Sequence, residues 1–544
     1  MTRRTVPLYV AALLAALGLL AGLAGTAAAE QPTLSEPEAV KLAEADDEVR
    51  DELGDHEGYT TEAEHEDGEW TVSFWTGSGE AREEVARAGI DDESWRVEYA
   101  YTGPQVEWQM ARGETGAYGK QANYWYVWGP LVLAFALAFV RTDRLFSLRN
   151  LDVAALLGFL VSHGFFREGI VEEAVILWYP PLLYLFVRTL LMGFGIGERV
   201  ERTSNLPTWL LLALAALAGG LVLFLNLDSR VIDVGYAGVA GGDRILDGII
   251  PYGNMPEDVG TGDTYGPLNY LLYVPFILMF GFSGEWDYLP AAHALTVFAF
   301  AGGAIAMFFA GFRLSGVRVG AAMLFAWAVF PYTLYSANNN TNDIVVAAVA
   351  AAGLALISSP IGRGVAVAAG FAIKLYPLLL APLWMLHGGL RRRSIVDFVL
   401  GGLAVLIASF WVLALGVSPV EGARLFYEST LSFQGDRETP WTIYAQVPEL
   451  SFLQRPLTVA VLVLAVLVAF LPRKRTVRRL AALSAAVVIG FQLTVNYWFY
   501  PYITWFEPFV FLALLPATGE KSPLDRGSGD QTPADHEEPR GLST

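Results

Sequence analysis

Two aspartates closely follow a long apolar run of the chain. The run covers residues 208–226, and Asp228 and Asp233 lie in the polar segment after it. A carboxylate at a membrane surface stays ionised and can accept a proton from a hydroxyl group, which is the task of a general base. We therefore predict that Asp233 is a catalytic base and that Asp228 orients the loop around it. A helix cap or a solvated loop acid is the alternative for each.

Lys374 interrupts a second apolar stretch. It is the only charged residue between positions 364 and 387. An ammonium within an apolar stretch is energetically costly, so such a residue indicates a function. Near the membrane interface the ammonium is suited to bind a phosphate and to stabilise it as a leaving group. Snorkelling of the ammonium to solvent is the alternative.

Tyrosines mark the start of a further apolar run. Tyr265, Tyr270 and Tyr273 follow Asp263 within the segment 262–273. Each tyrosine combines an apolar ring with a polar hydroxyl group, which suits contact with a lipid headgroup. An ordinary aromatic belt at the membrane interface is the alternative.

The elements that must position these residues are membrane helices. Hydrophobic residues make up 54% of the 544 residues, charged residues make up 17%, and the mean hydropathy is +0.41. Such a composition is typical of a membrane protein. We predict a mainly α, polytopic transmembrane helix bundle of about 12–13 membrane segments, some of them re-entrant. The apolar segments are 124–140, 151–166, 174–192, 208–226, 265–282, 289–312, 319–336, 343–358, 364–387, 396–416, 456–472, 480–496 and 499–516.

Positive charge predicts the orientation of the bundle, because cytoplasmic loops are enriched in arginine and lysine. The rule places residues 313–318, 388–395 and 473–479 in the cytoplasm. It places the loops 227–264 and 417–455, and with them the candidate site, outside the cytoplasm.

Two segments must deviate from simple spans to satisfy this orientation. We predict that 265–282 dips into the outer leaflet, with Pro267 and Pro275 interrupting its helix. Arginines flank both ends of 364–387, so we predict two half-helices that turn at Lys374-Leu-Tyr-Pro377.

The N-terminal region differs in composition from the bundle. Residues 1–29 read as a signal peptide, with an arginine pair, an apolar core and a small-residue cleavage site, and an uncleaved membrane anchor is the alternative. Residues 30–122 hold 25 acidic and 7 basic residues. Helical spacing over 37–53 and alternation over 69–75 and 95–101 predict a small α+β domain outside the cytoplasm. The helix and the Asp-Gly-x-Trp-x-Val-x-Phe strand resemble PepSY-type domains.

Composition also narrows the partners. The chain has no cysteine, which excludes disulfides and thiolate chemistry. The acidic balance of 55 Asp and Glu against 36 Lys and Arg argues against a nucleic acid partner. The six histidines are scattered, so the sequence predicts no cofactor and leaves a divalent metal open.

The order of motifs resembles the polyprenol-phosphate-sugar-dependent glycosyltransferases of the C-type membrane superfamily, in particular their bacterial mannosyltransferase-like branch. The motifs are an aspartate-bearing outer loop that ends in Gly248-Ile-Ile-Pro-Tyr252, then Tyr265-Gly-Pro-Leu, an asparagine-rich turn at 338–342, and Lys374-Leu-Tyr-Pro. The resemblance covers residues 208–516, which leaves 123–207 as additional transmembrane helices and 517–544 as a disordered cytoplasmic tail.

The resemblance implies roles for individual residues. Asp233 would be the catalytic base and Lys374 would contact the phosphate of a polyprenyl-phosphate sugar donor. Asn340 and Asn342 would line the sugar site. Further substrate contacts would come from Tyr265, Tyr376 and Asp263.

Three functions remain open from the sequence. The first is transfer of a sugar, mannose or another hexose or pentose, to a cell-envelope glycan or lipid acceptor outside the cytoplasm. The second is a polytopic transporter or lipid flippase, which would use intramembrane charges and broken helices. The third is a non-catalytic assembly or sensor protein built around the acidic domain.

Overall fold

A computed structural model describes most of the chain and divides it into two compact units, Met1–Arg112 and Gly113–Thr544. The predicted signal peptide and nearly all of the predicted tail lie outside the described residues. The described ranges are 32–56, 58–66, 68–78, 82–113, 123–197, 202–432, 439–473 and 475–517.

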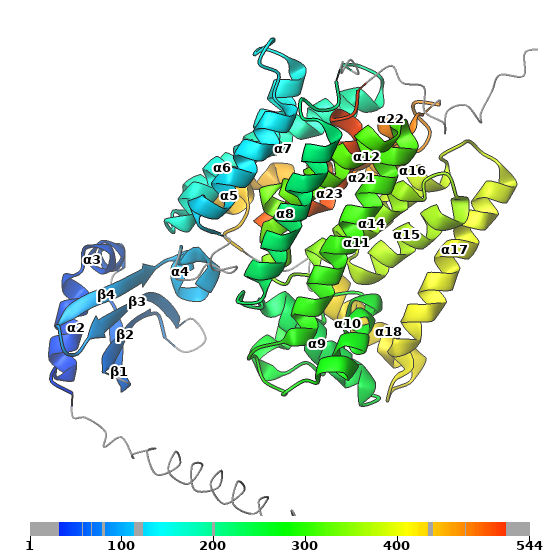
Figure 1. Cartoon of the computed structure of the whole chain (residues 1–544). Coiled ribbons are helices and arrows are strands. Elements are labelled where there is room, and N and C mark those ends of the chain that lie inside the picture. Colours follow the sequence, from blue (N-terminus) through cyan, green and yellow to red (C-terminus); the bar gives the residue numbers. More distant parts are fainter. Residues whose placement is uncertain are drawn as a thin grey trace, which may run out of the picture. The chain divides into compact units, whose positions relative to one another are not determined.

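The first unit is an α+β domain, as predicted. Two helices pack on a four-stranded antiparallel sheet of order β1-β2-β3-β4 (Figure 1). Buried apolar side chains of the strands, such as Val72 and Ile90, meet Ala39 and Val49 of the helices. The elements are α2 (Glu36–Ala45), α3 (Asp47–Gly54), β1 (Thr60–Glu66), β2 (Glu69–Thr76), β3 (Glu83–Asp91), β4 (Arg96–Thr102) and α4 (Pro104–Glu107).

The predicted helix 37–53 is wrong as a single element. It breaks at Asp46, whose carboxylate accepts hydrogen bonds from the backbone N–H groups of Glu48 and Val49 and so starts a second helix. The strands β1 and β3 were not predicted. β1 is a polar, solvent-exposed edge strand, so no apolar alternation marks it.

Asp92 ties the start of the described chain to the sheet. Its carboxylate accepts hydrogen bonds from the N–H groups of Thr33 (2.7 Å) and Leu34 (2.8 Å) and from the indole of Trp70 (3.2 Å). Burial by itself raises the pKa of Asp92, but these hydrogen bonds outweigh burial and hold the pKa below its ordinary value of 3.8.

We therefore expect this unit to be sensitive to acid. The contribution of Asp92 to stability is complete above pH 3.8 and is lost as the pH falls through the lower pKa of the folded unit. In hydrogen exchange, the protection factors of the Thr33 and Leu34 amides should fall in that window. Asp92→Asn keeps one acceptor oxygen, so already at pH 7 it should lose the protection of one of these two amides. Unchanged protection in Asp92→Asn at pH 7 would contradict the role of the carboxylate.

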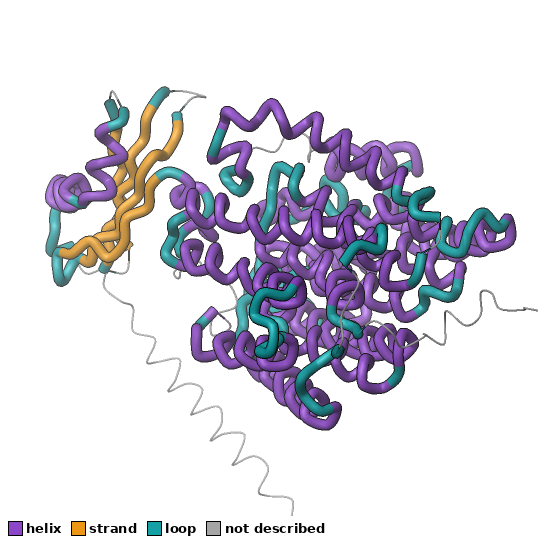
Figure 2. Tube along the Cα trace, turned by 90° about the horizontal axis from the view of Figure 1, so that it is seen from above, coloured by secondary structure: helices purple, strands orange, loops and turns teal. Residues whose placement is uncertain are grey.

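The second unit consists of helices joined by loops, and all described strands belong to the first unit (Figure 2). Each of the thirteen apolar segments forms a helix, or helices separated by a break. The helices are α5 (Trp125–Phe139), α6 (Leu148–Arg167), α7 (Val171–Gly193), α8 (Thr208–Asn226), α9 (Asp233–Leu246), α10 (Pro267–Phe280), α11 (Pro290–Ser315), α12 (Val317–Val329), α13 (Pro331–Asn338), α14 (Asp343–Ala355), α15 (Pro360–Ile373), α16 (Ala381–Met385), α17 (Arg392–Phe410), α18 (Pro419–Tyr427), α20 (Ile443–Gln446), α21 (Ser451–Leu467), α22 (Val477–Gln492) and α23 (Ile503–Leu514).

By length and composition, five helices among the described residues can cross a membrane, and the bent pair α12–α13 adds a sixth if it forms one span. The pair is bent by 52°, at Phe330-Pro331. The five are α7, α8, α11, α17 extended to Ala414, and α21 extended back to Pro448. This supports the predicted membrane association.

The segment predicted to be re-entrant is a short helix. The 14 residues of α10 extend about 21 Å at about 1.5 Å per residue, against a hydrocarbon core of about 30 Å. The predicted interruption by prolines is wrong, because Pro267 is the first residue of α10 and Pro275 lies within the continuous helix. A first-turn proline lacks only an N–H group that would be unpaired anyway.

The predicted break within 364–387 is confirmed. Helix α15 ends at Ile373, and Lys374 has extended backbone angles (φ −135°, ψ 148°). The chain then continues as a 3-10 helix, η5 (Tyr376–Leu380), followed directly by α16. Pro377 has no N–H group to donate to the Ile373 carbonyl, so α15 cannot continue through it as an unbroken α-helix, whereas a proline in the first turn of η5 is tolerated.

Candidate functional site

Asp233 is the first residue of a helix, not part of the predicted loop. Helix α9 begins at Asp233, whose exposed side chain lies at the positive end of the helix dipole. Glycines disfavour helices, and the four glycines of α9 explain why the sequence did not predict this helix. The helix forms because Gly238 and Gly241 let the rings of Tyr273 and Tyr270 on α10 pack directly against its backbone.

The Asn340 side chain holds the segment between α8 and α9 by hydrogen bonds. Its buried amide donates to the Ser229 hydroxyl (2.9 Å) and the Arg230 carbonyl (3.2 Å). Its oxygen accepts from the Asn226 amide (2.9 Å) and the Thr296 hydroxyl (2.8 Å). All four hydrogen-bonding positions of the Asn340 side chain are thus used within the protein. The Asn340 side chain thus holds the loop, and a contact of Asn340 with the sugar stays a prediction.

Further contacts make this segment rigid. The Ile232 N–H donates to the Asn339 carbonyl (3.3 Å), and the Trp286 indole donates to the Val231 carbonyl (2.9 Å). Val231 and Ile232 are buried, whereas the charged side chains around them are exposed. The exposed residues are Asp228, Arg230 and Asp233. The segment therefore has a backbone that is fixed by the protein interior and charged side chains that are exposed.

Lys374 does not snorkel to solvent. Its side chain is 8% exposed, and its ammonium donates to the carboxylate of Asp343, the first residue of α14. Three aromatic rings surround the ammonium, with centroids 5.5 Å (Tyr265), 5.1 Å (Tyr502) and 5.1 Å (Trp505) from Nζ. Cation–π attraction and the ion pair together offset the cost of burying the charge.

Asp343 is the centre of this cluster. The Trp505 indole donates to the same carboxylate oxygen as Lys374, and the Thr341 hydroxyl donates to the other oxygen. Asp233 also interacts electrostatically with Lys374. Asp233 thus lies within electrostatic range of Lys374, whereas the direct partner of the ammonium is the buried carboxylate of Asp343.

A close backbone approach places Tyr265 beside Lys374. The Gly266 N–H donates to the Ile373 carbonyl (3.0 Å), which joins the start of α10 to the end of α15. A Cβ atom on Gly266 would lie 2.2 Å from the Ala372 carbonyl oxygen. Only glycine fits at this contact, so Gly266 fixes the position of the tyrosine before it.

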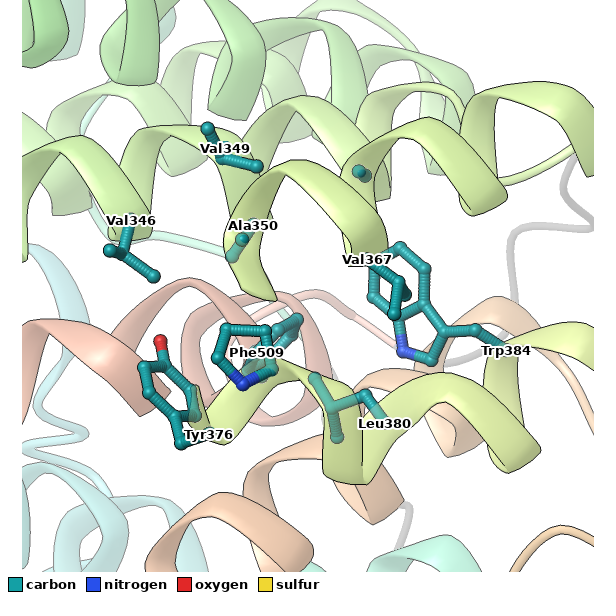
Figure 3. A pocket seen from close by; sticks show the side chains of 11 residues that line it. Val346, Val349, Ala350, Val367, Tyr376, Leu380, Trp384 and Phe509 are labelled. Carbon is teal, nitrogen blue, oxygen red and sulfur yellow. The ribbon is translucent and has the colours of Figure 1, made fainter. Parts of the chain in front are cut away.

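Tyr376 connects the cluster with a narrow apolar pocket. Its ring stacks on Trp505, with centroids 4.2 Å apart and an interplanar angle of 6°. Figure 3 shows Tyr376 at the pocket with apolar side chains such as Val346 and Leu380. Among the described residues its buried hydroxyl has no hydrogen-bond partner, although it lies within electrostatic range of Asp343.

Further unpaired polar atoms lie next to Asp343. The Asn342 amide donates to the Asn269 oxygen (2.8 Å), but the Asn342 oxygen and the Asn269 nitrogen have no partner in the described part of the chain. Within the described ranges, the Tyr273 hydroxyl, one turn beyond Asn269 on α10, also has no hydrogen-bond partner. Leaving such groups unpaired is costly, so buried water or a ligand group is expected here. Asn342 therefore keeps its predicted substrate role.

The hydrogen bonds of Asp263 go to residues outside the cluster around Lys374 and Asp343. It ends the 3-10 helix η4 (Glu257–Asp263), and its buried carboxylate accepts from the Gly253 N–H (2.8 Å) and the Ser429 hydroxyl (2.7 Å). These bonds join the turn at Gly253, the end of η4 and the π-helical turn Glu428–Ser432 at the end of the unit where α9, α10 and α18 meet (Figure 1). A substrate contact of Asp263 stays a prediction.

Sequence reasoning missed the partners of Lys374. Asp343 begins the apolar run 343–358, so the cost of a charge next to an apolar run was a signal for it as for Lys374. Tyr502 and Trp505 lie within the apolar run 499–516 and had no such signal.

No group of three or more histidine, aspartate or glutamate side chains suited to hold a metal occurs among the described residues. No protein-family model, curated protein or solved structure matches the chain, so the proposed resemblance to C-type glycosyltransferases and to PepSY-type domains rests on the motifs alone.

Proposed function

We propose that this chain is a membrane glycosyltransferase. It takes a sugar from a polyprenyl-phosphate donor and transfers it to a hydroxyl group of a cell-envelope glycan or lipid. The observation that carries the proposal is an exposed carboxylate, Asp233, within electrostatic range of a nearly buried ammonium, Lys374. A base and a cation in one cluster are the two groups that such a transfer requires.

The reaction follows from these charges. The acceptor oxygen attacks the anomeric carbon of the donor sugar, and its proton passes to the Asp233 carboxylate. The bond between the anomeric carbon and the phosphate oxygen breaks, and its electron pair leaves with the phosphate. Positive charge in the cluster stabilises the departing phosphate, and Asp343 holds the Lys374 ammonium in place. Attack opposite to the leaving group inverts the anomeric configuration.

The proposed site faces outside the cytoplasm, as the distribution of arginine and lysine predicts. Cysteine labelling tests this orientation, since the chain has no native cysteine. In intact cells an impermeant maleimide should label Val420→Cys, at a position 81% exposed, but should reach Val317→Cys (54% exposed) only after permeabilisation. Labelling of Val317→Cys in intact cells would contradict the re-entrant placement of α10.

Reconstitution tests the activity itself. The purified chain in lipid nanodiscs is incubated with polyprenyl-phosphate sugars and an envelope extract, and free polyprenyl phosphate is measured by mass spectrometry. We expect release of polyprenyl phosphate only when acceptor is present, together with a glycosylated product. Donors that remain intact with every extract would reject the proposal.

One observation favours a transporter as a second candidate. The Asp343–Lys374 ion pair lies at a helix break between short helices, an arrangement that coupled transporters use for ion binding. A proteoliposome assay that shows movement of a labelled lipid across the bilayer, without transfer of a sugar, would favour this function.

A further inference from the structure

We infer that Arg230 is the phosphate-binding residue of the site. Its guanidinium would recognise a phosphate monoester or diester at the membrane surface. That this phosphate belongs to a lipid-linked sugar donor rests on the proposed function. The inference adds a cation that sequence reasoning did not consider.

Lys374 alone is poorly suited to capture an anion. Its ammonium is almost fully buried and already bonded to Asp343, and the centroids of three aromatic rings lie within 5.5 Å of it. Asp233 contributes a second negative charge nearby. An incoming phosphate therefore meets an ammonium whose charge is compensated, and it requires another cation to bind first.

Arg230 is that cation. It lies between Asp228 and Asp233 in sequence, its side chain is exposed, and its guanidinium forms no ion pair in the part of the chain that the structure describes. Two other arginines of the second unit differ, because Arg244 donates to the Asn254 carbonyl and Arg424 is paired with Glu421.

Hydrogen bonds to a buried side chain fix the backbone of Arg230, although its own side chain is exposed. Its carbonyl accepts from the buried Asn340 amide, and Ser229 before it is bonded to the same amide. Asn340 is itself fixed by Asn226 and Thr296. A polar network of this kind is costly to bury unless every member is satisfied, and it orients what it holds.

The chemistry of the guanidinium fits a phosphate. Arginine presents its N–H donors in a planar fork that binds two phosphate oxygens at once, which a lysine ammonium does not do. Bound there, the phosphate lies on the same rigid segment as Asp233, so the base and the leaving group are held by one backbone. Lys374 then acts from the inner side of the cluster.

Binding of decaprenyl phosphate, a probe that carries no sugar, tests the inference. The full chain in nanodiscs is titrated as wild type, Arg230→Gln, Arg230→Lys and the matched control Arg455→Gln, another exposed arginine. Arg230→Gln should bind roughly 10- to 100-fold more weakly, the effect of losing a charge-assisted hydrogen bond. Arg230→Lys should recover part of the affinity, and Arg455→Gln should match the wild type.

Competition with inorganic phosphate separates the two sources of the anion. Displacement at millimolar concentration would show that the guanidinium reads the phosphate itself, whereas displacement only by lipid phosphates would show that the chain contributes. Either result supports the site if Arg230→Gln weakens binding. Wild-type affinity in a stably folded Arg230→Gln would overturn it. The binding assay measures no sugar transfer, which only the reconstitution assay detects. If binding depends on Arg230 but the reconstituted chain transfers no sugar, the proposed function is rejected and the inference about Arg230 stands.

Discussion

Asp233→Asn is expected to lower the turnover of sugar transfer by roughly 10²–10⁴-fold, the usual contribution of a positioned acid–base group. Asparagine keeps the size and polarity of the side chain but cannot take the proton of the acceptor hydroxyl. The exposed position at the start of α9 means that the fold should tolerate the change. Turnover is measured with a polyprenyl-phosphate sugar and an acceptor extract, and donor binding should be retained.

Asp228→Asn is the matched control, since Asp228 is exposed on the same fixed segment. We expect a milder loss, because this carboxylate orients the segment without accepting the proton. A dead Asp228→Asn beside a fully active Asp233→Asn would exchange the two roles. Full activity of both variants would reject the catalytic site and favour the transporter.

Breaking the Asp343–Lys374 pair is expected to destabilise the protein by about 3–5 kcal/mol for each single substitution, because the remaining buried charge loses its partner. Lys374→Met keeps most of the apolar stem, and Asp343→Asn keeps the shape of the side chain. The double variant buries no uncompensated charge at this site, so it should be less destabilised than the sum of the two single variants. Unfolding in detergent measures all four proteins of the cycle.

An exposed pair provides the comparison. Arg424 Nη2 and Glu421 Oε1 are 2.6 Å apart, and the two side chains are 55% and 42% exposed. Such exposed pairs contribute roughly 0–1 kcal/mol to the free energy of unfolding. Their cycle should show little coupling. Additive losses for Asp343→Asn and Lys374→Met would mean that the two groups do not stabilise each other.

Turnover tests the catalytic role of Lys374. Lys374→Met should lose about 2–4 kcal/mol of transition-state stabilisation, and Lys374→Arg should recover some of it.

Local sequence determined most helices of the second unit. Runs of apolar residues near 20 in length predict helices with little help from the rest of the chain, because in a bilayer each backbone must satisfy its own hydrogen bonds. The break at Lys374 was equally local, since a charge within an apolar stretch and Pro377 three residues later both act at that point. These features were predicted at nearly their observed positions.

Only the tertiary structure decided how the candidate site is assembled. Asp343 and Lys374 lie 31 residues apart, and Trp505 lies 162 residues beyond Asp343, so no local pattern indicates that they bond. The same holds for Asn340, whose role depends on Asn226, 114 residues away. Helix α9 exists because its glycines admit the rings of α10, which is a property of the pair and not of either segment. Side-chain pairing over such distances depends on how helices pack, and residue spacing along one chain does not encode it.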